Sequence, residues 1–178
     1  MVDIIEAKEA DIRAVTDIYA YNVAHGTGTF ALEPPVYDEM LAGFHNVKRM
    51  RLPYLVAVED GQVIGFAYAG PFRTRPGYRY GVEDSVYLAP GHTSKGIGKA
   101  LLNRLIDLSI ERGMYRMFGV IGDSDNLASI NLHEACGFVH TGRLPEAGYK
   151  FGRWLDVVFM TRELQPLENP PIGEGWAD

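Results

Sequence analysis

The chain has 178 residues, a single cysteine and a formal net charge of −6. A chain of this length folds as one domain that buries about 70% of its unfolded surface, which requires no disulfide, and the lone Cys136 can form no internal one. The acidic balance, the charged first residues and the lack of any apolar run of about 18 residues exclude a broad nucleic-acid surface, a signal peptide and a membrane span. We therefore expect a cytoplasmic domain that has neither nucleic acid nor membrane as its partner.

The first part of the chain is predicted to form two helices followed by a hairpin. Apolar residues recur at helical spacing from 11 to 24, where the glycines of the stretch HGTGTF end the pattern. A second helix is expected from 38 to about 50, after a pair of prolines. The β-rich runs 54–58 and 62–70 flank an Asp-Gly pair, which is typical of a tight hairpin turn.

The strand expected from 78 to 88, which follows a loop at 71–77, carries polar side chains on both faces. Side chains alternate between the two faces of a strand, so Asp84 shares one face with the neighbouring apolar residues, whereas Glu83 and Tyr87 share the other. An acid and a phenol therefore point the same way.

The second half mixes helices and strands. A helix from 97 to about 113 is followed by a strand at 115–121, a short helix at 127–136 and strands between 138 and 164, with a tight turn at Phe151-Gly152. This order predicts an α+β fold in a single domain of residues 1–164. Residues 165–178 are rich in proline, acidic and without lysine or arginine, and we expect them to form a mobile tail.

The segment HTSKGIGKALL, residues 92–102, follows a strand and opens a helix. This arrangement favours a phosphate ligand, because glycines let the ligand approach the backbone and the first amides of a helix have no partner. A Walker A loop would need a lysine where Ile97 stands, so that interpretation fails. A dinucleotide fingerprint would need a third glycine where Leu101 stands, which makes it a poor match.

The same segment resembles the pyrophosphate loop of the GNAT superfamily of acyl-CoA N-acyltransferases. Gly96 and Gly98 match the two glycines of that signature, and Thr93 departs from its initial Gln or Arg. The stretch NLASINLHEACGF, 126–138, resembles the downstream GNAT motif. Within the superfamily, the resemblance is to the phosphinothricin N-acetyltransferase group and covers about residues 4–164. It is carried by His133 and by the segments AGPFRTRPGY (69–78), VEDSVYL (82–88) and YKFGRWLD (149–156).

This resemblance implies a mixed, mostly antiparallel central sheet flanked by helices, with a strand that splays open at an acetyl-CoA site. It implies acetyl-CoA as the co-substrate and no metal, in keeping with the lack of metal-ligand spacing among the His, Cys and acidic residues. Asn126 is implied to contact the pantetheine arm. The backbone that holds the thioester and the pyrophosphate is implied to be that of Val86, Tyr87 and Leu88, and of Lys95, Gly96, Ile97, Gly98 and Lys99. For the two lysines the alternative is a solvated helix residue.

The resemblance also implies the residues that move protons. Glu83 matches the glutamate that acts as general base in this group, and His133 stands where the family often has a tyrosine that protonates the leaving thiolate. Tyr87 and solvent are the other candidates for that proton. The alternative for His133 is a buried or capping helix histidine, and Cys136 is interpreted as a core residue.

On the acceptor side, Arg73, Arg75 and Tyr78 lie on the loop beside the strand of Glu83. Guanidinium groups suit a carboxylate or phosphinate, whereas the alternative is a set of solvated arginines. Phe30 is expected to wall the acceptor site. Lys150 and its neighbour Phe151 are expected to reach it from the same or a second subunit, since the resembled enzymes are commonly homodimers.

The implied acceptors are small α-amino acids such as phosphinothricin, methionine sulfoximine or methionine sulfone. Two other functions stay open. One is acetylation of another amine, such as a polyamine, an arylalkylamine or a protein N-terminus, although a basic loop argues against a polyamine. The other is a silent acyl-CoA-binding sensor.

Overall fold

The computed structural model describes residues 1–176. Seven strands form one open sheet in the order β1-β2-β3-β4-β5-β7-β6, and every neighbouring pair is antiparallel except β4 and β5. The expected α+β fold with a mostly antiparallel sheet is confirmed. The strands are β1 (Val2–Glu6), β2 (Tyr54–Glu59), β3 (Gln62–Pro71), β4 (Gly81–Leu88), β5 (Arg116–Gly122), β6 (Val139–Lys150) and β7 (Arg153–Glu163).

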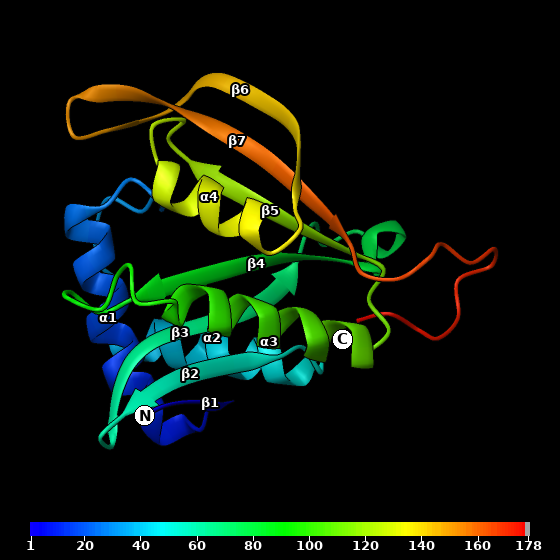
Figure 1. Ribbon diagram of the computed structural model, residues 1–178, viewed down its shortest axis with the longest axis horizontal. Helices are drawn as coiled ribbons and strands as arrows, with labels where there is room; N and C mark the ends of the chain where they lie inside the picture. The colour runs from blue at the N-terminus through cyan, green and yellow to red at the C-terminus, as the bar shows by residue number, and fades with distance from the viewer. Residues whose placement is uncertain (177–178) are drawn as a thin grey trace.

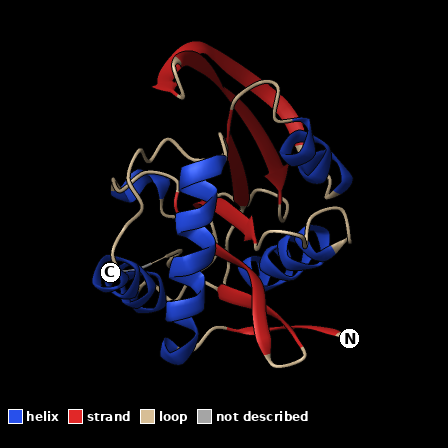
Figure 2. Cartoon of the chain, turned by 90° about the vertical axis from the view of Figure 1, so that its left-hand side faces the viewer, coloured by secondary structure: helices blue, strands red, loops and turns tan. Residues whose placement is uncertain are grey.

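Four α-helices cover both faces of this sheet: α1 (Ile12–His25), α2 (Tyr37–Arg49), α3 (Ile97–Glu111) and α4 (Leu127–Ala135). In Figure 1, α3 and α4 lie in front of the strands, with α1 and α2 behind them. The side view of Figure 2 likewise shows helices on both sides of the sheet. Each face of β4 is therefore covered by a different pair of helices, which decides what its alternating side chains meet.

The strand β1 was not predicted. It pairs with β2 over five positions, from Val2 opposite Glu59 to Glu6 opposite Leu55. Its residues include two acids and are mostly exposed, because it forms the edge of the sheet, and an edge strand needs little of the alternation by which a strand is recognised. The predicted hairpin turns are confirmed: Asp60 and Gly61, like Phe151 and Gly152, all have positive φ.

Strands β4 and β5 pair over only three positions, Gly81 to Glu83 opposite Arg116 to Phe118. Beyond Glu83, β4 continues to Leu88 along β3, whereas β5 turns away and continues along β7. The two strands therefore splay apart, as expected. Figure 1 shows the split between β4 and the β5-β7-β6 part of the sheet.

The segment after β7, for which we expect a mobile tail at 165–178, is described as far as Trp176, and residues 177–178 lie outside the described part. It leaves the end of β7 at the right of Figure 1, arches outward and returns to the body of the molecule. At its end the indole of Trp176 is buried, with 7% of the residue exposed. The expectation missed this contact because a proline-rich acidic stretch predicts disorder by composition, whereas one buried tryptophan can hold the end of such a stretch in place.

Candidate active site

The free edge of β4 lies at the splay. The amide of Ala89 donates to the Ile64 carbonyl of β3 at 2.9 Å, so by strand alternation the Val86 and Leu88 amides point away from β3, toward the side that β5 has left. The Leu88 carbonyl accordingly accepts from Asn22 Nδ2 rather than from a strand. Of the three residues expected to offer backbone donors, Tyr87 directs its amide to β3.

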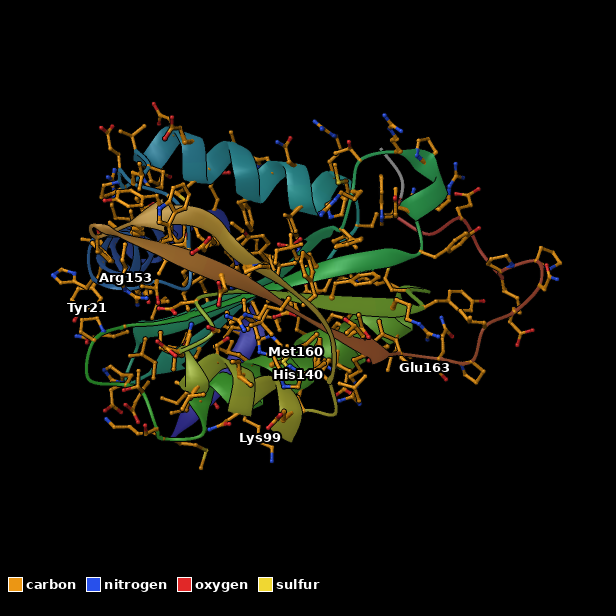
Figure 3. The ribbon with its side chains drawn as sticks, turned by 90° about the horizontal axis from the view of Figure 1, so that it is seen from above. Tyr21, Lys99, His140, Arg153, Met160 and Glu163 are labelled. Atoms are coloured by element: carbon orange, nitrogen blue, oxygen red, sulfur yellow. The ribbon has the colours of Figure 1, made fainter. Side chains whose placement is uncertain are left out.

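The start of α3 lies directly after this edge. Gly96 is its N-cap with φ 79°, a left-handed conformation that a side chain would strain, and Ser94 also has positive φ. The first amides of α3 therefore form an anion-binding turn. Gly98 is buried, and a Cβ there would make ordinary contact with Leu132 at 3.4 Å, so its expected part in pyrophosphate binding stays a prediction. Ile97 is buried, and Lys99 projects outward from this face of the molecule (Figure 3).

Glu83 lies on β4 at the last position that pairs with β5. Its side chain is about one third exposed, with 33% of its surface accessible. Burial, and after it the charge of neighbouring Asp84, raise the pKa of Glu83 to about 7, although the Arg73 guanidinium opposes them. A carboxyl group with a pKa near neutrality can take up and release a proton at working pH, which is what a general base requires.

Tyr87 shares the face of Glu83, as predicted. Its ring packs edge-on against Tyr19 of α1, with the centroids 5.0 Å apart, so this face of β4 is the one covered by α1. Burial raises the pKa of Tyr87 well above its ordinary value of 10. The phenol therefore keeps its proton at neutral pH.

The loop between β3 and β4 brings one arginine to Glu83. Arg73 Nη1 lies 4.0 Å from Glu83 Oε2, and its guanidinium stacks over the Phe72 ring at 4.3 Å. Arg75 and Tyr78 lie further along the same loop and are exposed. The structure thus places Arg73 beside the candidate base, whereas Arg75 and Tyr78 are exposed and their expected role in the acceptor site stays a prediction.

Lys150 holds the loop that follows α1. Its ammonium is buried, with 3% of the residue exposed, and donates to the carbonyls of Gly26 at 2.9 Å and Thr29 at 2.8 Å. Thr29 in turn bonds to the hydroxyl of Tyr19 on α1. The ring of Phe30 packs against Gly148, where a side chain would overlap it. The loop that carries Phe30 is therefore fixed by the tip of the β6-β7 hairpin of the same chain.

Replacing Lys150 by methionine should destabilise the protein by about 1–3 kcal/mol, because two buried carbonyls would lose their donor. Urea unfolding monitored by circular dichroism measures this loss. Lys48→Met is the matched control, since Lys48 pairs with Glu6 at the surface and should cost less than about 1 kcal/mol. A loss for Lys150→Met no larger than that of the control would contradict the assignment.

His133 lies on the other face of β4 from Glu83. Its Nε2 is 3.0 Å from Asp84 Oδ2 and its Nδ1 is 2.7 Å from the Ser129 carbonyl, so both ring nitrogens have partners inside the protein. Burial alone would lower the pKa of His133, but the hydrogen bond and charge of Asp84 outweigh it and raise the pKa. This geometry opposes the expected role as proton donor to a thiolate, and His133 is better described as half of a buried ion pair.

This pair needs Gly119 and was not predicted. A Cβ on Gly119 of β5 would lie 2.8 Å from the His133 ring, so only glycine leaves room for the imidazole to reach Asp84. The pair links α4 to β4 next to the point where β4 and β5 part. Asp84 could have been suspected from the sequence, because strand alternation places this acid among apolar residues.

Asn126 and Cys136 have structural partners. Asn126 is the N-cap of α4, where its Oδ1 accepts from the Ser129 amide at 3.2 Å, so its expected contact with a pantetheine arm stays a prediction. Cys136 is buried and burial raises the pKa of its thiol, which confirms its interpretation as a core residue.

Three features thus lie along β4 and the turn that follows it: the free edge of the strand, the phosphate-suited N-terminus of α3 and the half-buried carboxyl group of Glu83. This combination defines the class of enzymes that bind an acyl group on a phosphate-bearing carrier and transfer it.

Comparisons with known proteins agree with this class. The model of the Acetyltransferase (GNAT) family matches residues 19–138. A phosphinothricin N-acetyltransferase from Alcaligenes faecalis is 47% identical over 158 residues, which are 88% of this chain and 80% of the relative. An L-methionine sulfoximine/L-methionine sulfone acetyltransferase from Salmonella typhimurium is 42% identical, over 92% of this chain and 95% of the relative.

Solved structures are similar over nearly the whole chain. A protein from Salmonella typhimurium, solved with its cofactor acetyl-CoA, superposes with a TM-score of 0.92 at 40% identity, over 94% of this chain and 96% of that one. A GNAT superfamily phosphinothricin acetyltransferase from Sinorhizobium meliloti, in complex with acetyl-CoA, has a TM-score of 0.88 at 42% identity, over 98% and 90% of the two chains. The chain belongs to the GNAT family, and it is an acetyl-CoA-dependent N-acetyltransferase.

The described residues fit this co-substrate. The α3 turn offers amides to a pyrophosphate, and Gly96 leaves its approach open, since a Cβ there would meet no atom within 4 Å. Among residues 1–176 no group of three or more His, Cys, Asp or Glu side chains could hold a metal ion, and no helix is long and apolar enough to cross a membrane.

Proposed function

We propose that this protein acetylates the amino group of a small α-amino acid of the phosphinothricin, methionine sulfoximine or methionine sulfone type, with Glu83 as the general base. The observation that carries this proposal is the position of Glu83: its carboxyl group has a pKa of about 7 and lies on the same strand as the free amides of Val86 and Leu88. The names of the relatives from Alcaligenes faecalis and Salmonella typhimurium support the class of acceptor.

Acetyl-CoA supplies an acetyl group activated as a thioester. In the proposed arrangement, the first amides of α3 hold the pyrophosphate, and the amides of Val86 and Leu88 donate to the acetyl carbonyl, where negative charge develops. Glu83 accepts the proton of the acceptor ammonium, directly or through a water molecule, because only a neutral amine has a lone pair that can attack. The C–N bond that forms replaces the C–S bond of the thioester, and the thiolate that leaves takes up a proton from Tyr87 or from solvent.

Arg73 is proposed to bind the acid group of the acceptor. It lies 4.0 Å from Glu83, so an anion on its guanidinium would bring the amino group of the same molecule close to the base. Arg75 and Tyr78 are proposed to complete the acceptor site at the exposed rim, and Phe30 to wall it. We assign Lys150 to the support of this site.

We further propose that the enzyme is a cytoplasmic homodimer. The outer strand β6 is one of the two free edges of the sheet, opposite β1, and exposed apolar side chains gather on the β6-β7 hairpin: Val139, Leu144, Tyr149, Phe151 and Trp154. Sedimentation analysis should give the mass of two chains, and a single-chain mass at micromolar concentration would refute the dimer.

A thiol-release assay with acetyl-CoA and a panel of amines tests the acceptor. Phosphinothricin, methionine sulfoximine and methionine sulfone should be acetylated, whereas spermidine and a short peptide should not. Acetylation of the peptide alone would overturn the acceptor and keep the fold and cofactor. Acetyl-CoA binding without acetylation of any amine would favour a sensor.

The pH dependence of kcat/KM follows from the pKa of Glu83. A base works when it has lost its proton, so kcat/KM should fall as the pH is lowered through about 7. The Arg73 charge lowers the pKa of Glu83, so Arg73→Met should move this fall to higher pH. A profile in Arg73→Met that coincides with that of the parent enzyme would contradict their coupling.

A further inference from the structure

We propose that Trp176 is a positioning residue for the acceptor site. The C-terminal strap, residues 165–176, would hold the arginine loop, residues 71–80, in the place where Arg73 can present an acceptor to Glu83. This inference rests on the proposed function, since it assigns the arginine loop to the acceptor.

The contacts of Trp176 are with the backbone on which the arginine loop ends. Its amide donates to the Arg79 carbonyl at 2.9 Å, and its indole Nε1 donates to the Gly81 carbonyl at 3.2 Å. The residues between Pro166 and Glu174 are exposed, whereas Trp176 is buried. A long exposed stretch thus ends in a buried tryptophan whose backbone amide and indole Nε1 both donate hydrogen bonds, which is the arrangement expected of a segment held in place by its last contact.

Further contacts extend the strap along the same backbone. The Tyr80 hydroxyl donates to the Gly173 carbonyl at 3.0 Å, and the Ile172 amide donates to the Tyr115 hydroxyl at 2.9 Å. A side chain on Gly175 would overlap the Arg79 carbonyl, so strap and loop run against each other at backbone distance. Trp176 and Gly81, which are hydrogen-bonded here, lie 95 residues apart in the sequence.

The arginine loop has few other ties to the domain. At its start, Phe72 stacks on Phe118 with the ring centroids 3.9 Å apart, and its amide donates to the Gly81 carbonyl. Residues 73–79 are exposed. At its second end, the Tyr80 carbonyl accepts from the amides of Tyr115 at 2.9 Å and Arg116 at 3.3 Å. The strap adds to these bonds, and its bond to the Gly81 carbonyl lies two residues before Glu83 on the same backbone.

The position of the strap predicts which of the two substrates binds less well when the strap is loosened. Trp176 contacts the Gly81 end of β4, whereas the phosphate-binding turn follows its Leu88 end. Strands rise about 3.3 Å per residue, so roughly 23 Å separate the two ends. Loosening the strap should therefore affect the acceptor and leave acetyl-CoA binding unchanged.

Steady-state kinetics and limited proteolysis of Trp176→Ala in the full chain test this proposal. The KM for methionine sulfone should rise about 5- to 10-fold, while the KM for acetyl-CoA stays within about 2-fold of the parent. Trypsin should cleave after Arg73 and Arg79 faster than in the parent, whereas the bond between Arg75 and Pro76 resists trypsin in both. Trp176→Phe keeps an aromatic ring but lacks the Nε1 donor. Its acceptor KM and its cleavage rate should therefore lie between those of the parent and those of Trp176→Ala. Ile5→Ala, which shortens an exposed apolar side chain on the edge strand β1, is the control outside the strap and should match the parent.

Each result decides the proposal. A folded Trp176→Ala enzyme with the acceptor KM and the cleavage rate of the parent would overturn it, as would equal losses toward both substrates, which indicate a general structural role. If Trp176→Ala does not fold, Trp176→Phe decides by the same measurements. If no amine of the panel is acetylated, the proposed function fails, and faster tryptic cleavage still shows whether the strap holds the loop.

Discussion

Replacing Glu83 by glutamine should lower kcat for the amino-acid acceptor at least about 100-fold, which is the usual range for loss of a general base. Glutamine keeps the shape of the side chain but cannot take up the ammonium proton. In the proposed arrangement, backbone amides of β4 and α3 hold acetyl-CoA, so the affinity for acetyl-CoA should be nearly unchanged. Thiol release measures kcat, and calorimetry measures acetyl-CoA binding.

The control is Glu163→Gln, which removes an exposed carboxylate at the end of β7 (Figure 3). It should leave kcat within about 2-fold of the parent, since surface substitutions away from a site have small effects. Unchanged turnover in Glu83→Gln would discard the general base, and a large loss of acetyl-CoA affinity would assign Glu83 to binding. In a variant with measurable residual activity, the fall in kcat/KM below pH 7 should also disappear, because the group that titrates there is gone.

The parts of the fold that the sequence predicts are those set by local rules. Asp60-Gly61 and Phe151-Gly152 form turns as expected, because a two-residue hairpin turn requires positive φ at both positions. The alternation of Glu83 and Asp84 on β4 follows from the period of a strand. The splay between β4 and β5 came only from the resemblance to GNAT proteins, since free backbone amides have no side-chain signature.

The missed parts depend on contacts between distant segments. Helical spacing does not say which face of a sheet a helix covers, so the sequence alone does not bring His133 to Asp84, on the face of β4 away from Glu83. Lys150 is expected to reach the acceptor site, but the sequence does not indicate its carbonyl partners, because they lie more than 120 residues earlier. The contact between His133 and Asp84 also depends on Gly119. The need for glycine there cannot be recognised from the sequence, because it arises only where β5 and α4 pack together.

Disrupting the Asp84–His133 pair should cause the largest loss of stability. Removing one partner of a buried ion pair costs about 3–5 kcal/mol, because the other is left charged, or neutral without its partner, inside the protein. The residues are almost fully buried, and Asp84 Oδ1 has no hydrogen-bond partner among the described residues, so His133 is its main compensation. We expect losses in this range for His133→Phe, measured as the free energy of unfolding in urea.

Gly119→Ala tests the same pair without touching either member. Its Cβ would lie 2.9 Å from His133 Nε2, the atom that bonds to Asp84, so the imidazole must move and the bond must lengthen. The matched control is Gly142→Ala on β6, where a Cβ meets no atom within 4 Å. Since Gly119→Ala and His133→Phe remove the same interaction, their effects should not add in the double variant. Full additivity would mean that the steric cost of Gly119→Ala is unrelated to the pair.

The dependence of stability on pH gives a second measurement of the pair. The pKa of His133 is raised in the folded protein above its ordinary value of 6.5, so folding favours the protonated imidazole. The stabilisation from the pair is therefore fully present below pH 6.5 and is lost as the pH rises through the raised pKa. Glu83, whose pKa is raised to about 7, also makes stability fall as the pH rises, so His133→Phe should reduce the decrease rather than abolish it, whereas Gly142→Ala should keep all of it. A decrease of the same size in His133→Phe and in the parent would show that the imidazole is neutral when folded, and that the contact with Asp84 is an ordinary hydrogen bond.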